Sequence, residues 1–316
     1  MLRPIVIFYE ASYSHNRKSH LERQPFDPRL KEVARKWRLS YHRIERTMAS
    51  ETEIRRAVER DWIWRPQVHG LRVVEREGIL GTITTISTIV LNNISWVQLT
   101  EDSADRVIRE VHELFTGSRD RRYSWWVSEL ATPNDMGDRL LQFGLRRLDE
   151  GVTGMALSNL DRPIPASPEV TVRKAEPSDE DMSEVARIFS VSDFLEADTG
   201  PWAARWFQAA DGSMGTRTYL AFLPEVDRPV AAASMWNVMG GRVVYLAGAA
   251  TLPEYRGRGT YTALLARRLQ EARADGADGA VIHASIHSVP ICRKHGFRDI
   301  SSYAIYFWDP TGRLGS

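Results

Sequence analysis

The sequence contains little cysteine and almost no net charge. Its 316 residues include one cysteine, Cys292, which excludes a disulfide framework and any cysteine-rich zinc site and fits a reducing compartment. The 42 basic and 41 acidic side chains leave a formal net charge of +1, whereas a dedicated nucleic-acid binder is usually strongly basic. We therefore expect no metal site and no general affinity for nucleic acid.

Long apolar runs are also missing. No stretch reaches the roughly 18 consecutive apolar residues that a membrane-spanning helix needs. The apolar run among the first ten residues is about six residues long, shorter than the roughly 7–15 residues of a signal-peptide core, and we interpret it as a strand. We expect a cytoplasmic protein with no membrane partner.

The near-zero net charge covers an uneven distribution. Residues 1–65 carry 15 basic and 9 acidic side chains, and residues 166–316 carry 16 and 18. A basic first region could steer an anionic ligand or partner, and the alternative is a solvated arginine-rich face.

The length predicts about two domains. Three prolines within residues 159–168 make a stiff connector, so we place the domain boundary near residue 165, with domains 1–165 and 166–316.

The second domain alternates strand and helix patterns. Ser178 is a good helix N-cap, and the acids after it suit the positive end of a helix. The apolar periodicity predicts strands at 169–173, 216–223, 230–238, 243–251, 280–284 and 303–308, and helices after Ser178, at 202–210, from Gly259 to 274 and at 289–295. This order predicts an α/β (α+β) fold, a mixed and mostly antiparallel sheet flanked by helices.

The first domain has a weaker pattern of the same kind. It predicts helices at 28–44, 105–115 and 135–143, a β-branched strand at 79–91, and strands at 125–129 and 153–157. Phe143-Gly144 follows a helix, as His295-Gly296-Phe297 does near the end of the chain. We expect the two domains to share one fold.

The loop before the long helix has the composition of an anion-binding site. Residues 253–259 read Pro-Glu-Tyr-Arg-Gly-Arg-Gly and join a strand directly to a helix. Glycines let the backbone approach a phosphate, and the helix N-terminus adds positive potential. Arg256 and Arg258 can add charge-assisted hydrogen bonds. The alternative is a glycine-rich connector with two solvated arginines.

In its context the segment resembles the acyl-CoA-binding motif of the GNAT N-acyltransferase superfamily. The motif, Arg or Gln, two residues, Gly, one residue, Gly or Ala, falls here on Arg256, Gly259 and Tyr261, and Ser288–Phe297 resembles the helix-Gly-Phe signature downstream. The resemblance covers about residues 169–308 and implies tandem GNAT domains, of which the first is a degenerate copy without the loop. It implies acetyl-CoA or another acyl-CoA as cofactor, bound by Ala249, Ala250, Thr251, Arg256, Gly257, Arg258, Gly259, Thr260, Tyr261 and Ser285.

The sequence departs from the family pattern at two places. Tyr261 replaces the last Gly or Ala of the loop motif, and Cys292 stands where the family often has a tyrosine as general acid. The candidate catalytic residues are His283, Cys292 and Glu196. His283 has a pKa suited to base chemistry but lies in a core strand, where a structural role is the alternative. Glu196, like Asp198, would lie over the acceptor cleft by resemblance, and Cys292 would be an acid or a packing residue.

The leading hypothesis is an N-acyltransferase, most simply an acetyltransferase, in which a primary amine attacks the thioester directly. The expected acceptor is a small-molecule amine. Two other hypotheses stay open: a non-catalytic acyl-CoA sensor or scaffold, and an acyltransferase acting on a peptide or an aminoacyl-tRNA through the basic first region. A homodimer is compatible with the sequence.

Overall fold

The computed structural model describes residues 49–63, 68–117, 121–191 and 200–312, which belong to one compact unit, Met48–Ser316. The strand expected near the N-terminus and the helix expected at 28–44 lie outside the described residues. Within these ranges, no helix has both the length and the apolar character to cross a membrane.

The part of the chain before the predicted boundary contains a strand–helix–strand unit framed by further strands. Its elements are α2 (Glu51–Arg56), the π-helix η1 (Ala57–Asp61), β1 (Leu71–Arg76), β2 (Ile79–Thr84), β3 (Asn93–Val97), α3 (Glu101–Thr116), β4 (Tyr123–Ser128), α4 (Met136–Gln142), β5 (Arg146–Arg147) and β6 (Val152–Leu157).

The part after the boundary follows the predicted order closely. Its elements are β7 (Thr171–Lys174), α5 (Asp179–Ser190), α6 (Gly200–Ala209), η2 (Ser213–Gly215), β8 (Arg217–Phe222), β9 (Ala231–Val238), η3 (Met239–Gly241), β10 (Val243–Thr251), η4 (Pro253–Tyr255), α7 (Thr260–Ala274), β11 (Gly279–Ala284), α8 (Val289–Lys294) and β12 (Arg298–Trp308). The Ser178 hydroxyl caps α5 by accepting from the Asp181 N–H, as predicted.

The described strands form one twelve-stranded sheet in the order β1-β2-β3-β4-β12-β6-β11-β10-β9-β8-β7, with β5 paired to β12. The pairs β3–β4 and β10–β11 are parallel, and the other ladders are antiparallel. The mixed, mostly antiparallel sheet predicted from the sequence is therefore confirmed. Each parallel pair is joined through one α-helix, α3 or α7, with the short η4 also preceding α7.

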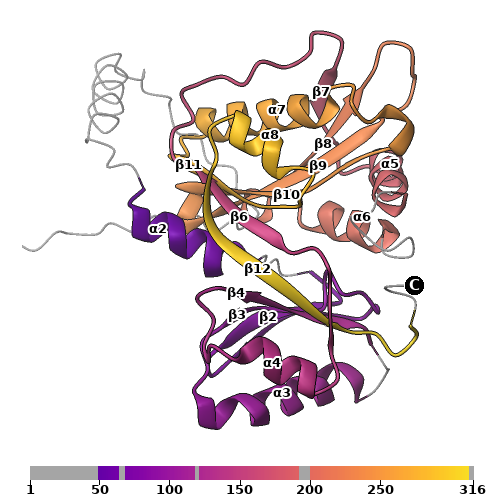
Figure 1. Ribbon diagram of the computed structural model, residues 1–316. Helices are drawn as coiled ribbons and strands as arrows, with labels where there is room; N and C mark the ends of the chain where they lie inside the picture. The colour runs from indigo at the N-terminus through magenta and orange to yellow at the C-terminus, as the bar shows by residue number, and fades with distance from the viewer. Residues whose placement is uncertain (1–48, 64–67, 118–120, 192–199, 313–316) are drawn as a thin grey trace, which may run out of the picture. The chain divides into compact units, whose positions relative to one another are not determined.

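The sheet is continuous across the predicted boundary near residue 165. The long C-terminal strand β12 pairs with β4 and β5 as well as with β6, and β6 pairs in turn with β11. Figure 1 shows β12 crossing from the region of β11 to the region of α3 and α4. The two-domain division stays a prediction.

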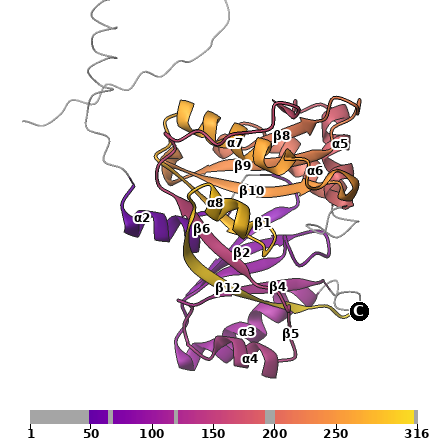
Figure 2. The same ribbon diagram turned by 45° about the horizontal axis from the view of Figure 1, so that its top comes forward.

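Helices cover both faces of the sheet in the second part of the chain. Alternation along a strand sends neighbouring side chains to opposite faces. Thus Ala280 and Ile282 of β11 pack with Leu264 of α7 and Cys292 of α8, whereas Val281 packs on the other side with η1 residues and Trp206 of α6. Figure 2 shows α7 and α8 close together over this part of the sheet.

The strand expected at 79–91 is shorter than predicted. β2 ends at Thr84 because the buried side chain of Asn92 takes over the hydrogen bonds of the next residues. Its Oδ1 accepts from the Thr84 N–H at 2.7 Å, and its Nδ2 donates to the Ile86 carbonyl at 2.7 Å. A β-branched run predicts strand propensity but not this competing side chain.

Sequence reasoning also missed α2 and the π-helix that continues it. The signal was present as a capping box, in which Ser50 and Glu53 exchange hydrogen bonds between side chain and backbone. The buried residues Ile54, Ala57 and Val58 then place this helical segment against the sheet beside β6, β11 and β12.

Candidate active site

Strands β10 and β11 separate part of the way along β10. They pair in parallel only from Val243 to Tyr245 and from Gly279 to Val281. On its other edge β10 stays paired with β9 up to Thr251, with a bulge between Ala247 and Ala249. The β11-facing edge of residues 246–251 therefore presents backbone groups that no described strand uses, and a ligand with amide groups could pair with them.

The loop after β10 takes the geometry expected of an anion cradle. Gly257 and Gly259 have φ of 77° and 82°, a left-handed conformation that side chains with a Cβ rarely adopt. A Cβ at Gly257 would meet no atom within 4 Å, so the backbone conformation, not crowding, calls for glycine there.

The N-terminus of α7 is open. Gly259 is its N-cap residue, and no side chain caps the helix there. The hydroxyls of Thr251 and Thr260 lie 3.1 Å apart and join the end of β10 to the first turn of α7. The first N–H groups of a helix need external partners and carry partial positive charge, so this end of α7 suits an anionic group.

The two loop arginines differ in their contacts. Arg258 forms an ion pair with Glu225 at 2.6 Å, and Arg256 Nε donates to the Thr251 carbonyl at 3.4 Å. Both lie at the surface. Arg256 thus contacts the end of β10, whereas a phosphate bound at the loop would have to replace Glu225 as the partner of Arg258.

The other expected cofactor residues also lie near the strand separation. Ala249 and Thr251 are partly exposed and Ala250 is buried, all three on the unpaired stretch of β10. Ser285 follows the end of β11 and is exposed, with its hydroxyl 3.3 Å from that of Ser288. The ten predicted cofactor residues stay predictions, and the structure places them on β10, the loop, α7 and the end of β11.

Cys292 lies on α8 and is fully buried. Burial raises the pKa of its thiol, against smaller opposing effects of Tyr261 and of the Arg268 charge. The Tyr261 hydroxyl is 3.5 Å from Cys292 Sγ. The two departures from the family pattern are therefore in contact.

His283 lies on β11 between four aromatic rings from other parts of the chain. The nearest ring centroids are those of Trp62 at 4.4 Å and Tyr303 at 4.7 Å, and Tyr245 Oη is 3.2 Å from Nδ1. Burial lowers the pKa of His283 to about 3, and the Val58 carbonyl opposes this by a smaller amount. Such a ring holds a proton weakly at neutral pH, which favours the structural alternative over base catalysis. Glu196, with Asp198, lies outside the described residues.

Sequence reasoning missed Arg268. It follows Tyr261 by seven residues on α7, so both lie on one helix face, and it is fully buried. Its Nη1 donates to the carbonyls of Ala247, at the bulge of β10, and Ser234, and its Nε donates to the Leu264 carbonyl. The available signal was a charged residue within the apolar stripe of Leu264, Leu265 and Leu269.

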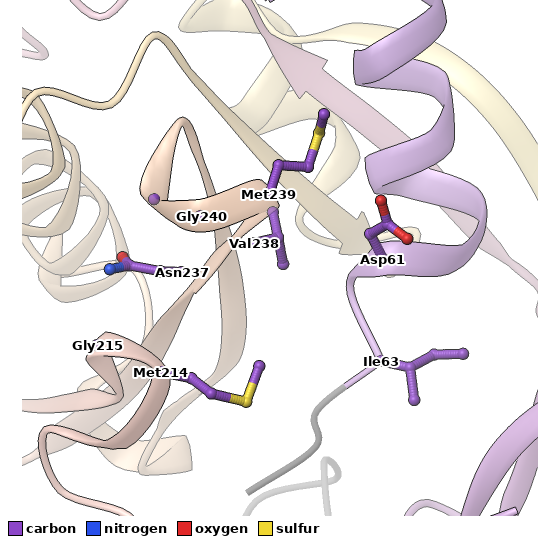
Figure 3. A pocket seen from close by; sticks show the side chains of 9 residues that line it. Asp61, Ile63, Met214, Gly215, Asn237, Val238, Met239 and Gly240 are labelled. Atoms are coloured by element: carbon purple, nitrogen blue, oxygen red, sulfur yellow. The ribbon is translucent and has the colours of Figure 1, made fainter. Parts of the chain in front are cut away.

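A separate cavity of about 450 Å³ lies at the opposite end of β10. It is lined by residues of η1, η2 and the β9–β10 turn, among them Asp61, Met214 and Met239 (Figure 3). It does not include the loop at residues 253–259. Within the described ranges, no group of three His, Cys, Asp or Glu residues could bind a metal ion.

Comparison with known proteins gives a consistent assignment. Residues 183–297 match the model of the acetyltransferase (GNAT) family, a segment that runs from α5 to the end of α8 and includes the cradle. No curated protein matches the chain.

Solved structures with the same fold cover most of the chain. A GCN5-related N-acetyltransferase from Kribbella flavida is 21% identical with a TM-score of 0.58, over 78% of this chain and 91% of that one. A tandem GNAT protein from the clavulanic acid biosynthesis pathway is 15% identical with a TM-score of 0.53, over 88% and 95%. A conserved protein of unknown function from Staphylococcus epidermidis is 9% identical with a TM-score of 0.55, over 76% and 94%.

Proposed function

Because the chain belongs to the acetyltransferase (GNAT) family through residues 183–297, we propose that it moves an acyl group, most simply acetyl, from acyl-CoA to a primary amine by direct attack. One observation carries the proposal: an unpaired strand edge and an uncapped helix N-terminus follow each other along the chain. The unpaired edge of β10 leads directly into the uncapped N-terminus of α7.

The residues fit acyl-CoA at both ends of this path. The N–H groups of the Gly257–Gly259 turn and of the first turn of α7 would hold the pyrophosphate, with Arg256 and Arg258 at its rim. The unpaired backbone of residues 246–251 would hydrogen-bond the pantetheine amides, as a neighbouring strand would. Bound there, acyl-CoA supplies an acyl carbon activated by a thiol leaving group.

The chain's own part in the reaction would be to orient the thioester, to polarise its carbonyl and to accept a proton from the amine. The pairing of β10 with β11 stops at Tyr245, just before the bulge at Ala247–Ala249, so an N–H group of this stretch can donate to the thioester oxygen as negative charge develops on it. The amine must lose a proton because a free alkylamine has a pKa of about 10. Glu196 stays the proposed base, since His283 is enclosed by aromatic rings.

Calorimetry with acetyl-CoA, followed by mass spectrometry of products from a panel of amines, tests the proposal. We expect saturable binding and an acetylated amine. A folded protein that binds no acetyl-CoA at millimolar concentration contradicts it. Binding without turnover against small amines, peptides and aminoacyl-tRNA would instead support a sensor.

A further inference from the structure

The bulge in β10 shifts the alternation of the strand by one residue. Before the bulge, the last regular pair with β9 is Ala247 opposite Ser234, and after it the ladder resumes with Ala249 opposite Ala233. Residues two positions apart on a regular strand share a face. Here Ala249 packs with the part of the core that contains α7 residues, whereas Ala247 packs on the opposite face of the sheet. The packing thus confirms that β10 contains one extra residue.

Backbone groups alternate along a strand as side chains do. The N–H and C=O groups of one residue point to one edge of a strand, and those of the next residue point to the other edge. One extra residue therefore reverses which of residues 249–251 turn their backbone groups toward β11. The bulge decides which N–H groups a ligand in the strand separation would meet.

Arg268 of α7 lies at the last regular pair before the bulge. A single atom, Nη1, donates to the Ala247 carbonyl at 3.1 Å and to the carbonyl of its partner Ser234 at 2.9 Å. The Nε of Arg268 donates to the Leu264 carbonyl at 3.2 Å, one turn earlier on α7. The arginine thus ties both strands of the ladder to α7 at the point where the register shifts.

This tether is a buried charge without a counter-charge among the described residues. Arg268 is fully buried, and its Nη2 has no hydrogen-bond partner there. Its neighbours Tyr219, Tyr261 and Cys292 have pKa values raised by burial, so they are uncharged at neutral pH. An unpaired buried cation is costly, and an apolar side chain would match the leucines around it. The charge therefore points to a role that an apolar side chain could not fill.

We propose that Arg268 is a positioning residue for acyl transfer, which holds the bulge of β10 and so sets which backbone groups of residues 249–251 face the thioester. This role rests on the proposed function. Arg268 acts through the carbonyls of Ala247 and Ser234 and does not need to touch the ligand. Its effect is expected at the acyl end of the site, because the cradle at Gly257–Gly259 follows the end of β10.

The test compares Arg268→Met with Arg268→Lys, and Leu269→Ala is the matched control for lost packing. Leu269 is the next residue of α7 and is buried in the core that α7 shares with β10. The first readout needs no ligand: nuclear magnetic resonance of the cross-strand contact between Ala249 and Ala233. We expect R268M to lose this contact, because methionine donates to neither carbonyl. R268K should keep it, since one nitrogen makes both bonds in the wild type, and L269A should keep it too.

The second readout is acetyl transfer to any amine that the wild type acetylates. We expect kcat to fall about 30-fold in R268M, with the Kd for acetyl-CoA within about threefold. The melting temperature of R268M should stay unchanged or rise, because an unpaired buried charge is removed. R268K should keep kcat within about threefold, since its ammonium still donates. L269A should show the reverse pattern, a lower melting temperature with the wild-type kcat.

A third substitution covers the case in which R268M does not fold. Arg268→Gln keeps one amide donor group, and its kcat should fall between those of R268M and R268K. A kcat of R268Q equal to that of the wild type, with the contact between Ala249 and Ala233 retained, would overturn the role of Arg268.

The remaining outcomes separate the two levels of the proposal. A wild-type protein that binds no acetyl-CoA overturns the proposed function and the role of Arg268 together. Acetyl transfer by the wild type with an equal kcat in R268M overturns the role of Arg268 and leaves the proposed function standing. An equal fall of kcat in R268M and L269A does the same, because it would trace the loss to packing.

Discussion

The N-terminus of α3 and the N-terminus of α7 follow the first strand of a parallel pair, and one is closed where the other is open. At α3, Thr100 and Ser103 form a capping box, in which each side chain accepts from the other residue's N–H. At α7, the N-cap is Gly259, with no side-chain cap. A helix end already supplied with acceptors has little left to offer an anion.

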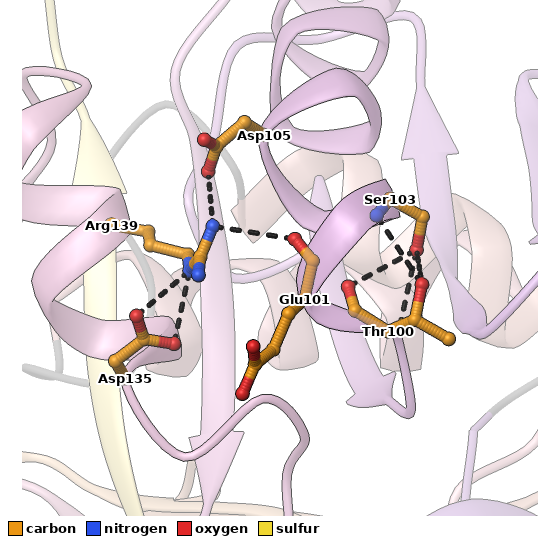
Figure 4. Close-up of polar contacts among 6 residues, drawn as sticks. All are labelled: Thr100, Glu101, Ser103, Asp105, Asp135 and Arg139. Atoms are coloured by element: carbon orange, nitrogen blue, oxygen red, sulfur yellow. Dashed lines mark hydrogen bonds and ion pairs between the residues drawn. The ribbon is translucent and has the colours of Figure 1, made fainter.

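The charges around the two helix ends differ in the same direction. The first turn of α3 contains Glu101 and Asp102, whereas the first turn of α7 contains no acid. Figure 4 shows Arg139 of α4 reaching the Glu101 carbonyl and the carboxylates of Asp105 and Asp135. Arg139 thus pairs with carboxylates of α3 and of the start of α4, although both carboxylates are exposed.

The strands differ as well. β3 and β4 pair in parallel over two positions, and beyond them a further parallel bridge joins Gln98 and Thr132. The Leu99 N–H donates to the Thr132 carbonyl, and the Thr132 N–H donates to the Val97 carbonyl. Among the described residues no such bridge joins residues 246–251 to the chain after β11. One unit thus bridges the gap between its strands with its own backbone, and the other has no such bridge among its described residues.

Of the substitutions considered, Gly257→Val should reduce the affinity for acetyl-CoA the most. A β-branched residue at φ 77° distorts the cradle and places a side chain where a phosphate would approach. We expect the Kd for acetyl-CoA, measured by calorimetry, to rise at least about 30-fold, equivalent to roughly 2 kcal/mol.

Gly240→Val is the matched control. Gly240 also has a left-handed φ, 67°, and a Cβ there would likewise meet no atom within 4 Å, but it lies at the other end of β10. Both variants should lose similar thermal stability, and G240V should keep its affinity. Equal loss of affinity in the two variants would show that backbone strain, not the cradle, governs binding.

Strands β11 and β4, each the second strand of a parallel pair, provide the second test. His283 of β11 and Trp126 of β4 face each other within one aromatic cluster, with ring centroids 5.8 Å apart. Burial lowers the pKa of His283 to about 3, so the unfolded chain binds this proton more readily. The histidine therefore costs no stability above its unfolded pKa of about 6.5, and stability falls as the pH drops from there toward the folded pKa.

Between pH 7.5 and pH 5.5 this single group should reduce the free energy of unfolding by about 1.4 kcal/mol. Urea titrations of the wild type and of His283→Leu at both pH values measure it. The difference between the two proteins should shrink or reverse at the lower pH. A parallel pH dependence in both would mean that the folded-state pKa of His283 lies near its unfolded value of about 6.5, and would return His283 to the candidate bases.

Sequence patterns predicted most of the second part of the chain because its signals are local. The Ser178 cap, the run 243–251 and the glycines at 257 and 259 each depend on a few adjacent residues. The first part was harder because its strands end through distant contacts, such as Asn92 with the Arg122 carbonyl at 3.1 Å. A period of two or of 3.6 residues carries no information on such partners.

The lack of information on distant partners also explains why the candidate site could be predicted only in part. The loop could be found from spacing, but the environment of His283 depends on rings from β4, β10 and β12 and on that of Trp62, which follows η1. The contact between Tyr261 and Cys292 joins residues 31 positions apart. Their separate departures from a motif could be recognised in the sequence, and their meeting could not.

Thr262→Glu places an acid in the first turn of α7, as Glu101 and Asp102 do in the first turn of α3. An acid in the first turn stabilises a helix through its dipole, yet it would repel the phosphates that the open end is proposed to bind. We expect acetyl-CoA affinity to fall about fivefold, roughly 1 kcal/mol, with an unchanged or higher melting temperature. The uncharged Thr262→Gln is the control, and an equal loss in both would point to crowding in place of charge.

Thr100→Ala weakens the cap at the N-terminus of α3, the closed helix end, and should have the smallest effect of these substitutions. It removes one hydroxyl from the capping box of α3, which should lower the free energy of unfolding by about 0.5–1 kcal/mol in urea titrations. Because the α3 terminus is not part of the proposed acyl-CoA site, the Kd for acetyl-CoA should stay at the wild-type value. If T100A instead gained a second binding event in calorimetry, the cap itself would be what keeps the first unit from binding the ligand, and the remaining bridge between Gln98 and Thr132 would not suffice to close it.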